Sequence, residues 1–133
     1  DGLAKCGVAS QDCDELGEPV MKLNHVNLSV TDVPAASQFL QKYFGLRSIA
    51  GAEDSKFTAL FDDDGMVLTL MKVGQVKYPA TFHIGFGQSS EAHVDAINQR
   101  LQADGFAVDP PQRSHAWTFY VQAPGGFTVE VLC

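Results

Sequence analysis

The sequence predicts an α+β fold in which a strand–helix–strand–strand–strand unit occurs twice. Apolar residues alternate with period two along several short segments and recur with helical spacing along two longer ones. Two pairs of segments also match each other at nearly the same offset, residues 23–30 with 81–88 and residues 65–71 with 126–132. An internal repeat of this kind predicts two similar modules that bury a shared core.

The first unit begins with a strand over residues 22–30, whose apolar and polar side chains alternate. Thr31 or Asp32 is expected to cap a helix that Gly45 ends, because short polar residues favour the N-cap and glycine favours the C-terminal end. Three short strands are predicted after it, near residues 46–50, 56–62 and 66–73.

The second unit repeats this order. A strand over residues 80–87 is followed by Ser89 or Ser90 as a helix cap, and Gly105 is expected to end the helix. Three strands are predicted after it, near residues 106–109, 115–122 and 127–132.

Charge and composition limit the classes of partner. The formal net charge is -7, and residues 1–20 contribute -4 because they hold one lysine against five acidic residues. The absence of a basic stripe argues against nucleic acid, and no apolar run approaches the roughly 20 residues of a membrane span. We expect a single domain over residues 21–133, with modules at about 21–76 and 77–133, preceded by an acidic tail or arm.

The three cysteines, Cys6, Cys13 and Cys133, do not form a metal-type cluster. An odd number near the ends of the chain is not the pattern of a secreted disulfide framework. We therefore expect a reducing, cytoplasmic setting. A bridge between Cys6 and Cys13 is the alternative.

Two histidines and one glutamate are candidate metal ligands. His25 and His83 occupy equivalent positions in the two units, and the alignment of the last strands places Thr69 opposite Glu130. A carboxylate on a strand interior is costly unless it meets a cation or good hydrogen bonds. Two imidazoles and one carboxylate suit Fe, Mn, Zn or Ni and leave positions open for substrate. The alternative is two hydrogen-bonded histidines and an ion-paired glutamate.

Further residues are candidates for contact with a small-molecule substrate. Asn27 shares the strand face of His25, and Thr69 stands opposite Glu130 in the repeat. Arg113 and His115 precede a strand near the expected rim of the site. The alternative for these four residues is a surface position facing water.

Three segments resemble the vicinal oxygen chelate superfamily, which includes glyoxalase I, extradiol dioxygenases and bleomycin-resistance proteins. They are "LNHVNLSVTDVPAASQFLQKYFGL", "TFHIGFG" and "FYVQAPGGFTVEVL". The resemblance implies two βαβββ modules in a cupped, mixed β-sheet, and a homodimer that completes the cup. The family's ligand positions fall on His25, His83 and Glu130, and its fourth position falls on Thr69.

The resemblance also implies a function. A member that keeps these ligands is a metal-dependent enzyme whose substrate binds one divalent metal through vicinal oxygens. Tyr120 matches an active-site tyrosine of the family, with a core tyrosine as the alternative. Because Thr69 replaces a glutamate that moves a carbon-bound proton in glyoxalase I, dioxygenase-like or lyase and transferase chemistry is favoured. The alternative is a metal-free ligand-binding protein of the bleomycin-resistance type.

Overall fold

A computed structural model describes residues 21–49 and 54–133. The expectations for residues 1–20, including Cys6 and Cys13, lie outside this part of the chain. Cys133 is a free, exposed thiol. Within the described residues, no helix is long and apolar enough to cross a membrane.

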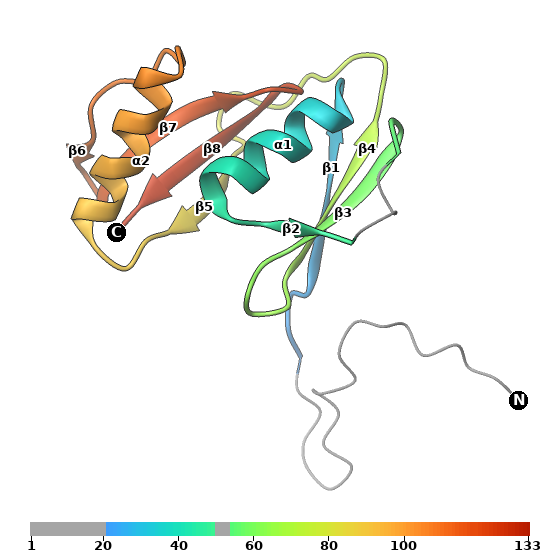
Figure 1. Ribbon diagram of the computed structural model, residues 1–133, viewed down its shortest axis with the longest axis horizontal. Helices are drawn as coiled ribbons and strands as arrows, with labels where there is room; N and C mark the ends of the chain where they lie inside the picture. The colour runs from blue at the N-terminus through green and yellow to red at the C-terminus, as the bar shows by residue number, and fades with distance from the viewer. Residues whose placement is uncertain (1–20, 50–53) are drawn as a thin grey trace, which may run out of the picture.

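The first module is a mixed four-stranded sheet with one helix (Figure 1). Its sheet has the strand order β1-β4-β3-β2, in which β1 runs parallel to β4 and the other pairs are antiparallel. The elements are β1 (His25–Val30), α1 (Val33–Phe44), β2 (Arg47–Ser48), β3 (Phe57–Phe61) and β4 (Val67–Lys72).

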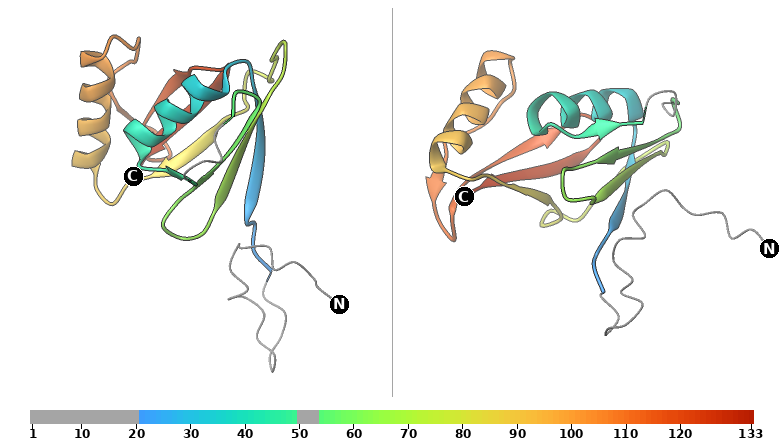
Figure 2. Two further views of the ribbon diagram at one scale, coloured as in Figure 1. Left: turned by 45° about the vertical axis from the view of Figure 1, so that its right-hand side comes forward. Right: turned by 60° about the horizontal axis from the view of Figure 1, so that its bottom comes forward.

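The second module repeats this topology, with strand order β5-β8-β7-β6 and β5 parallel to β8. The elements are β5 (Ile84–Gly87), α2 (Glu91–Ala103), β6 (Gln112–Arg113), β7 (Trp117–Ala123) and β8 (Phe127–Leu132). The predicted pair of βαβββ modules is therefore confirmed. In the described chain they form two separate four-stranded sheets, which are set at an angle to each other (Figure 2).

Two residues set the boundaries of α1. The Asp32 side chain accepts a hydrogen bond from the Ala35 backbone N–H at 3.0 Å, which satisfies a donor that the first helical turn leaves unpaired. Gly45 adopts φ 67°, the left-handed conformation that ends many helices. Of the two caps considered for this helix, Asp32 is the one used, and in the second helix Ser90 is used.

The prediction of a strand over residues 106–109 is wrong. The strand that takes this place in the second module is β6. Two consecutive prolines at 110–111 cannot donate backbone hydrogen bonds to a sheet. The Asn98 side chain on α2 instead donates to the Asp109 carbonyl at 2.8 Å. The Phe106 ring packs against α1, 5.4 Å from the Phe39 ring centre. This segment therefore joins the modules through side chains.

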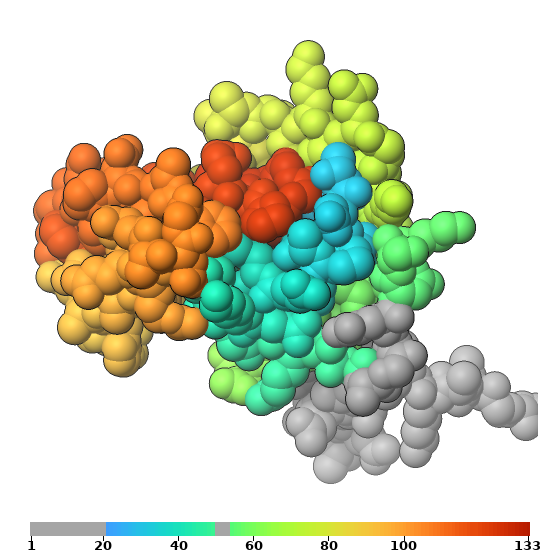
Figure 3. Space-filling model, turned by 45° about the horizontal axis from the view of Figure 1, so that its top comes forward, coloured from blue at the N-terminus to red at the C-terminus, as the bar shows by residue number. Residues whose placement is uncertain are grey.

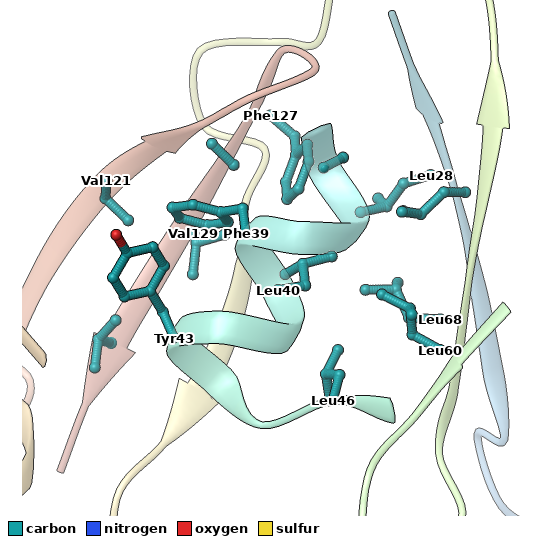
Figure 4. Close-up of a cluster of buried hydrophobic side chains, with 14 of the residues drawn as sticks. Leu28, Phe39, Leu40, Tyr43, Leu46, Leu60, Leu68, Val121, Phe127 and Val129 are labelled. Carbon is teal, nitrogen blue, oxygen red and sulfur yellow. The ribbon is translucent and has the colours of Figure 1, made fainter. Parts of the chain in front are cut away.

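Helix α1 supplies the core between the two sheets (Figure 4). Leu40 faces the first sheet, while Phe39 and Tyr43 point toward Val121 and Val129 of the second. All five side chains are buried. Because one helix covers a face of both sheets, burial of its apolar residues joins the modules as well as stabilising each.

A polar contact also joins the modules. The Tyr43 hydroxyl on α1 donates to Asp104 at the end of α2 at 2.5 Å, and Lys42 lies 3.0 Å from the same carboxylate oxygen. The Arg100 guanidinium lies over the Tyr43 ring and donates to the Lys42 carbonyl. The hydrogen bonds from Tyr43 and Lys42 hold the pKa of Asp104 below its usual value.

The variant Asp104→Asn tests this contact. A carboxyl group whose pKa is lowered by folding stabilises the protein above its unfolded pKa and loses that effect as the pH falls. The variant should be less stable than the native protein at neutral pH, and the difference should shrink as the pH falls below 3.8, the ordinary value for this group. Urea unfolding across the pH range measures the difference. The same profile in Asp64→Asn, at an exposed turn, would show that net charge is responsible instead.

The turn between β7 and β8 lies against the start of α1 (Figure 3). The Thr31 backbone N–H donates to the Gly125 carbonyl at 3.0 Å. Gly125 adopts φ 99°, and a Cβ atom at this position would lie 3.0 Å from Val30 Cβ. The close approach of the turn and the first strand therefore requires glycine here.

The variant Gly125→Ala should lower the free energy of unfolding by about 2 kcal/mol or more, because backbone strain and a steric overlap add together. Gly105→Ala is the matched control, since Gly105 also has a positive φ of 91° but no heavy atom within 4 Å of an added Cβ. The control should show the strain alone, about 1–2 kcal/mol. Equal losses in urea unfolding would rule out the steric contribution.

The free edge of β1 carries an unusual contact. The Tyr78 hydroxyl accepts a hydrogen bond from the Ser29 backbone N–H at 2.8 Å and donates to the Ser29 carbonyl at 2.9 Å. The Tyr78 ring stacks on Phe82, with ring centres 4.4 Å apart. One side chain thus satisfies both backbone groups that Ser29 presents at the edge of its sheet.

Candidate functional site

Each sheet has one face away from the helices, and the candidate site residues lie on these two faces. In the first sheet the face carries His25, Asn27 and Thr69, because side chains alternate along β1 and Asn27 pairs with Thr69. In the second sheet it carries Tyr120 and Glu130, which are paired between β7 and β8. Most residues of these two faces are exposed or half-buried, whereas Glu130 is buried.

The Glu130 carboxylate is surrounded by polar side chains. His115 Nε2 and the Thr118 hydroxyl each lie 2.7 Å from Oε1, and both donate to it. His83 Nε2 lies 3.2 Å from the other oxygen, Oε2. These contacts explain why a carboxylate is tolerated at a position where only 6% of its side chain is exposed.

His83 immediately precedes β5 instead of lying within the strand that the sequence predicts. Its Nδ1 lies 2.9 Å from the Thr81 carbonyl oxygen, which can only accept, so Nδ1 carries the proton. In the neutral ring the Nε2 lone pair then faces Glu130 Oε2. A proton or a cation between these two atoms removes that repulsion.

The separation of these two atoms matches that of two neighbouring ligands on one divalent metal. Ligand atoms about 2.1 Å from one metal lie roughly 3 Å apart when they subtend a right angle. The 3.2 Å between His83 Nε2 and Glu130 Oε2 is close to that separation. A hydrogen bond from Nδ1 to a backbone carbonyl is also the usual way in which proteins orient a metal-binding histidine.

His25 has the same orientation of its ring protons. Its Nδ1 lies 2.7 Å from the Asn24 side-chain oxygen, so Nδ1 donates and Nε2 is left with its lone pair on an exposed face. However, His25 does not join the other two candidate ligands within one chain. Among residues 21–49 and 54–133, no group of three or more His, Cys, Asp or Glu side chains could hold a metal ion.

Hydrogen bonding controls the titration of the site. Burial alone would raise the pKa of Glu130, but hydrogen bonds from Thr118, His115 and Tyr120 outweigh it and hold the pKa below its usual value. Burial and the neighbouring carboxylate raise the pKa of Tyr120. At neutral pH Glu130 is therefore ionised and Tyr120 keeps its proton.

The residues predicted to contact a substrate do not all lie in one place. The Thr69 hydroxyl donates to the Asn27 side-chain oxygen at 2.8 Å, so these two residues form one polar unit beside His25. The Arg113 guanidinium pairs with Glu91 and lies over the Trp117 ring. Arg113 is thus held against α2, and contact with a substrate remains a prediction for it.

His115 and Tyr120 line a cavity of about 320 Å³ beside Glu130. Tyr120 is 45% exposed, and its ring meets the His83 ring edge-on, with centres 5.5 Å apart. On the neighbouring strand, Gly85 pairs with Glu130 and adds no side chain to this face. No side chain from position 85 of β5 therefore covers the carboxylate.

Sequence reasoning did not assign roles to Asn24, Thr118 or Gly85. The alternation of β7 places Thr118 two residues from Tyr120 on the face of Glu130, so that pattern contains a signal for it. The contact between Asn24 and His25 depends on the conformation of the chain before β1. No periodicity in the sequence indicates it.

Comparison with known proteins identifies the family. Residues 22–131 match the family model described as "Glyoxalase/Bleomycin resistance protein/Dioxygenase superfamily". The chain belongs to this superfamily. A solved structure described as a "possible Glyoxalase from Bacillus cereus" shares 56% sequence identity, with a TM-score of 0.81 over 86% of this chain and all of that one.

More distant members share the fold. The fosfomycin resistance protein FosX from Listeria monocytogenes, solved with Mn(II) and dihydroxypropylphosphonic acid, is 23% identical, with a TM-score of 0.71 over 85% of this chain and 92% of that one. A "Probable trivalent organoarsenical cleaving enzyme" from Bacillus subtilis is 31% identical over 87 residues. That match spans 65% of this chain and 58% of the relative.

Two variants at Glu130 test whether the carboxylate serves the fold or a ligand. In the presence of a metal chelator, the free energy of unfolding of Glu130→Gln should be no more than about 1 kcal/mol below the native value. The amide keeps the acceptor oxygen and donates a hydrogen bond to His83. Glu130→Ala should lower the free energy of unfolding by about 1–3 kcal/mol, because Thr118 and His115 lose their acceptor. If urea unfolding shows equal losses in both variants, the charge itself stabilises the fold.

Proposed function

We propose that this superfamily member is a metal-dependent enzyme that acts on a small molecule with neighbouring oxygen atoms. The observation that carries the proposal is the approach of His83 Nε2 to Glu130 Oε2 at 3.2 Å, with His83 Nδ1 held by the Thr81 carbonyl. His83 and Glu130 would hold a divalent metal, and the Nε2 of His25 is the third candidate ligand. A bound metal would act as a Lewis acid on the substrate oxygens.

We further propose that a second copy of the chain supplies His25. The faces that carry His25 and Glu130 belong to separate sheets, and the residues do not meet within one chain. Large apolar side chains on these faces, Phe57, Met71 and Tyr120, are exposed. In a symmetric dimer, the first module of one copy would cover the second module of the other.

The chain's own residues define the chemistry around the proposed metal. Tyr120 remains protonated at neutral pH, so it is suited to donate a hydrogen bond or a proton to a substrate oxygen. Thr69 offers a neutral hydroxyl that is already bonded to Asn27. Because a hydroxyl is a poor base, dioxygenase-like or lyase and transferase reactions are favoured over removal of a carbon-bound proton.

The organoarsenical-cleaving relative suggests a more specific substrate class. Trivalent arsenic is a soft acceptor, and thiolates are the soft ligands that proteins offer. Cys133 is the free cysteine within the described residues and follows β8, which carries Glu130. A trivalent aryl arsenical therefore belongs in a substrate panel beside catechols and glutathione hemithioacetals.

A metal-free ligand-binding protein is the second candidate. A groove of about 510 Å³ between the modules favours it, because its floor is mainly apolar. The apolar lining residues are Val26, Phe44, Leu46, Met66, Leu68, Ile84 and Phe86. Asp62, Asp63 and Asp64 lie at this groove.

Metal content separates the two candidates. Protein purified without chelator should contain about one divalent metal per chain, and His83→Ala should lose it, because a site of three ligands does not hold metal well with two. His93→Ala, on the exposed side of α2, is the matched control and should keep the metal. No metal in the native protein after reconstitution would favour the ligand-binding function.

Mixing variants tests whether two copies share the site. His25→Ala and Glu130→Gln should each lack metal, but an equal mixture refolded together should regain about a quarter of the native metal content, because half of the dimers carry one intact site. Elemental analysis after removal of free metal measures the recovery. A mixture without metal would contradict the shared site.

A further inference from the structure

We infer that His115 and Thr118 are positioning residues that make Glu130 a one-oxygen metal ligand and so keep a third coordination position free beside a chelating substrate. The inference rests on the proposed metal site and extends it to residues that would not touch the metal. It follows from how the two carboxylate oxygens are occupied, from where the donors come and from how firmly they are held.

The two oxygens of Glu130 have different surroundings. Oε1 receives hydrogen bonds from both His115 Nε2 and the Thr118 hydroxyl, each at 2.7 Å. A carboxylate oxygen has two lone pairs, so these two donors occupy Oε1 fully. Oε2 faces His83 Nε2 at 3.2 Å. Because Tyr120 is a third donor to this carboxylate, Oε2 keeps one lone pair, and that lone pair is the one available to a metal beside His83.

Thr118 is a fixed donor. It is 5% exposed, and its side chain is branched at Cβ, which restricts its rotation. It lies on β7 next to β8, where the register of the antiparallel pair places its hydroxyl beside the Glu130 side chain.

His115 lies on a short turn that is anchored at both ends. On one side the Arg113 guanidinium pairs with Glu91 of α2. On the other side the Trp117 indole donates to Asp95 of α2 at 2.8 Å. His115 is therefore presented to Glu130 by a turn held against the helix, although its own ring is half exposed.

The way Glu130 binds a metal would decide how many coordination positions remain for other ligands. A six-coordinate metal with three one-oxygen or one-nitrogen protein ligands keeps three positions, and a substrate that binds through two oxygens needs two of them. If both oxygens of Glu130 bound the metal, two positions would remain and the substrate would fill both. His115 and Thr118 would thus set how many additional ligands the site accepts.

The experiment uses the full chain loaded with cobalt(II), whose absorption spectrum reports coordination number, and 4-nitrocatechol as a two-oxygen probe. Thr118→Val combined with His115→Ala should change the cobalt spectrum, both without and with 4-nitrocatechol, and weaken cobalt binding by about tenfold, a size typical of changes around metal ligands. Thr118→Ser keeps the hydroxyl and should retain the native spectrum and affinity. His93→Ala controls for loss of a histidine elsewhere.

The outcomes separate this inference from the proposed function. A native protein that binds cobalt while the double variant keeps the same spectra and the same cobalt affinity would overturn the positioning role and leave the metal site intact. A native protein that binds no cobalt would overturn both. Far-ultraviolet circular dichroism and urea unfolding of each variant verify that the fold is retained, and Thr118→Val alone serves if the double variant does not fold.

Discussion

One constraint underlies this structure: each module has a single helix, and a helix covers only one face of a sheet. Helix α1 covers both sheets on the same side, so their other faces have no partner within the described chain. A bare face with exposed Phe57, Met71 and Tyr120 is poorly suited to water. The same shortage of covering elements that exposes these side chains also exposes His25 and the route to Glu130.

The site shows how a fold accommodates a buried carboxylate. Glu130 lies between Val129 and Val131, which are fully buried on the opposite face of β8, and its own side chain is only 5% exposed. Hydrogen bonds from Thr118 and His115 make the carboxylate tolerable. Functional sites commonly hold residues of this kind, and the stability they forgo is supplied by the core elsewhere.

Much of the fold could be predicted from the sequence because local signals agree with one another. Asp32, Pro34 and Gly45 mark both ends of α1, and β8 lies where the alternation over residues 127–132 places it. The strand expected at 106–109 failed because its apolar residues pack against a helix instead of a neighbouring strand. Apolar spacing does not distinguish these two surroundings.

The candidate site was predictable only in part. The repeat identifies His25 and His83 as equivalent, but pseudo-symmetry does not say whether they meet within one chain or between two. His115 approaches Glu130 because Trp117 and Arg113 hold its turn against α2. That contact depends on tertiary packing between segments that are far apart in the sequence and show no shared pattern. The alternation of β7 could therefore indicate Thr118 as a neighbour of Glu130, but no pattern indicates that His115 is a second hydrogen-bond donor to the same carboxylate.

The Tyr78 hydroxyl at the edge of β1 has a consequence for how copies of this chain can associate. A strand with unpaired backbone groups can accept another strand, and repeated additions build an open-ended sheet. By bonding to both backbone groups of Ser29, Tyr78 interrupts the row of groups that an added strand would need. A strand added at this edge would therefore have to displace the Tyr78 hydroxyl from Ser29, whereas an association through the sheet faces would leave this contact in place.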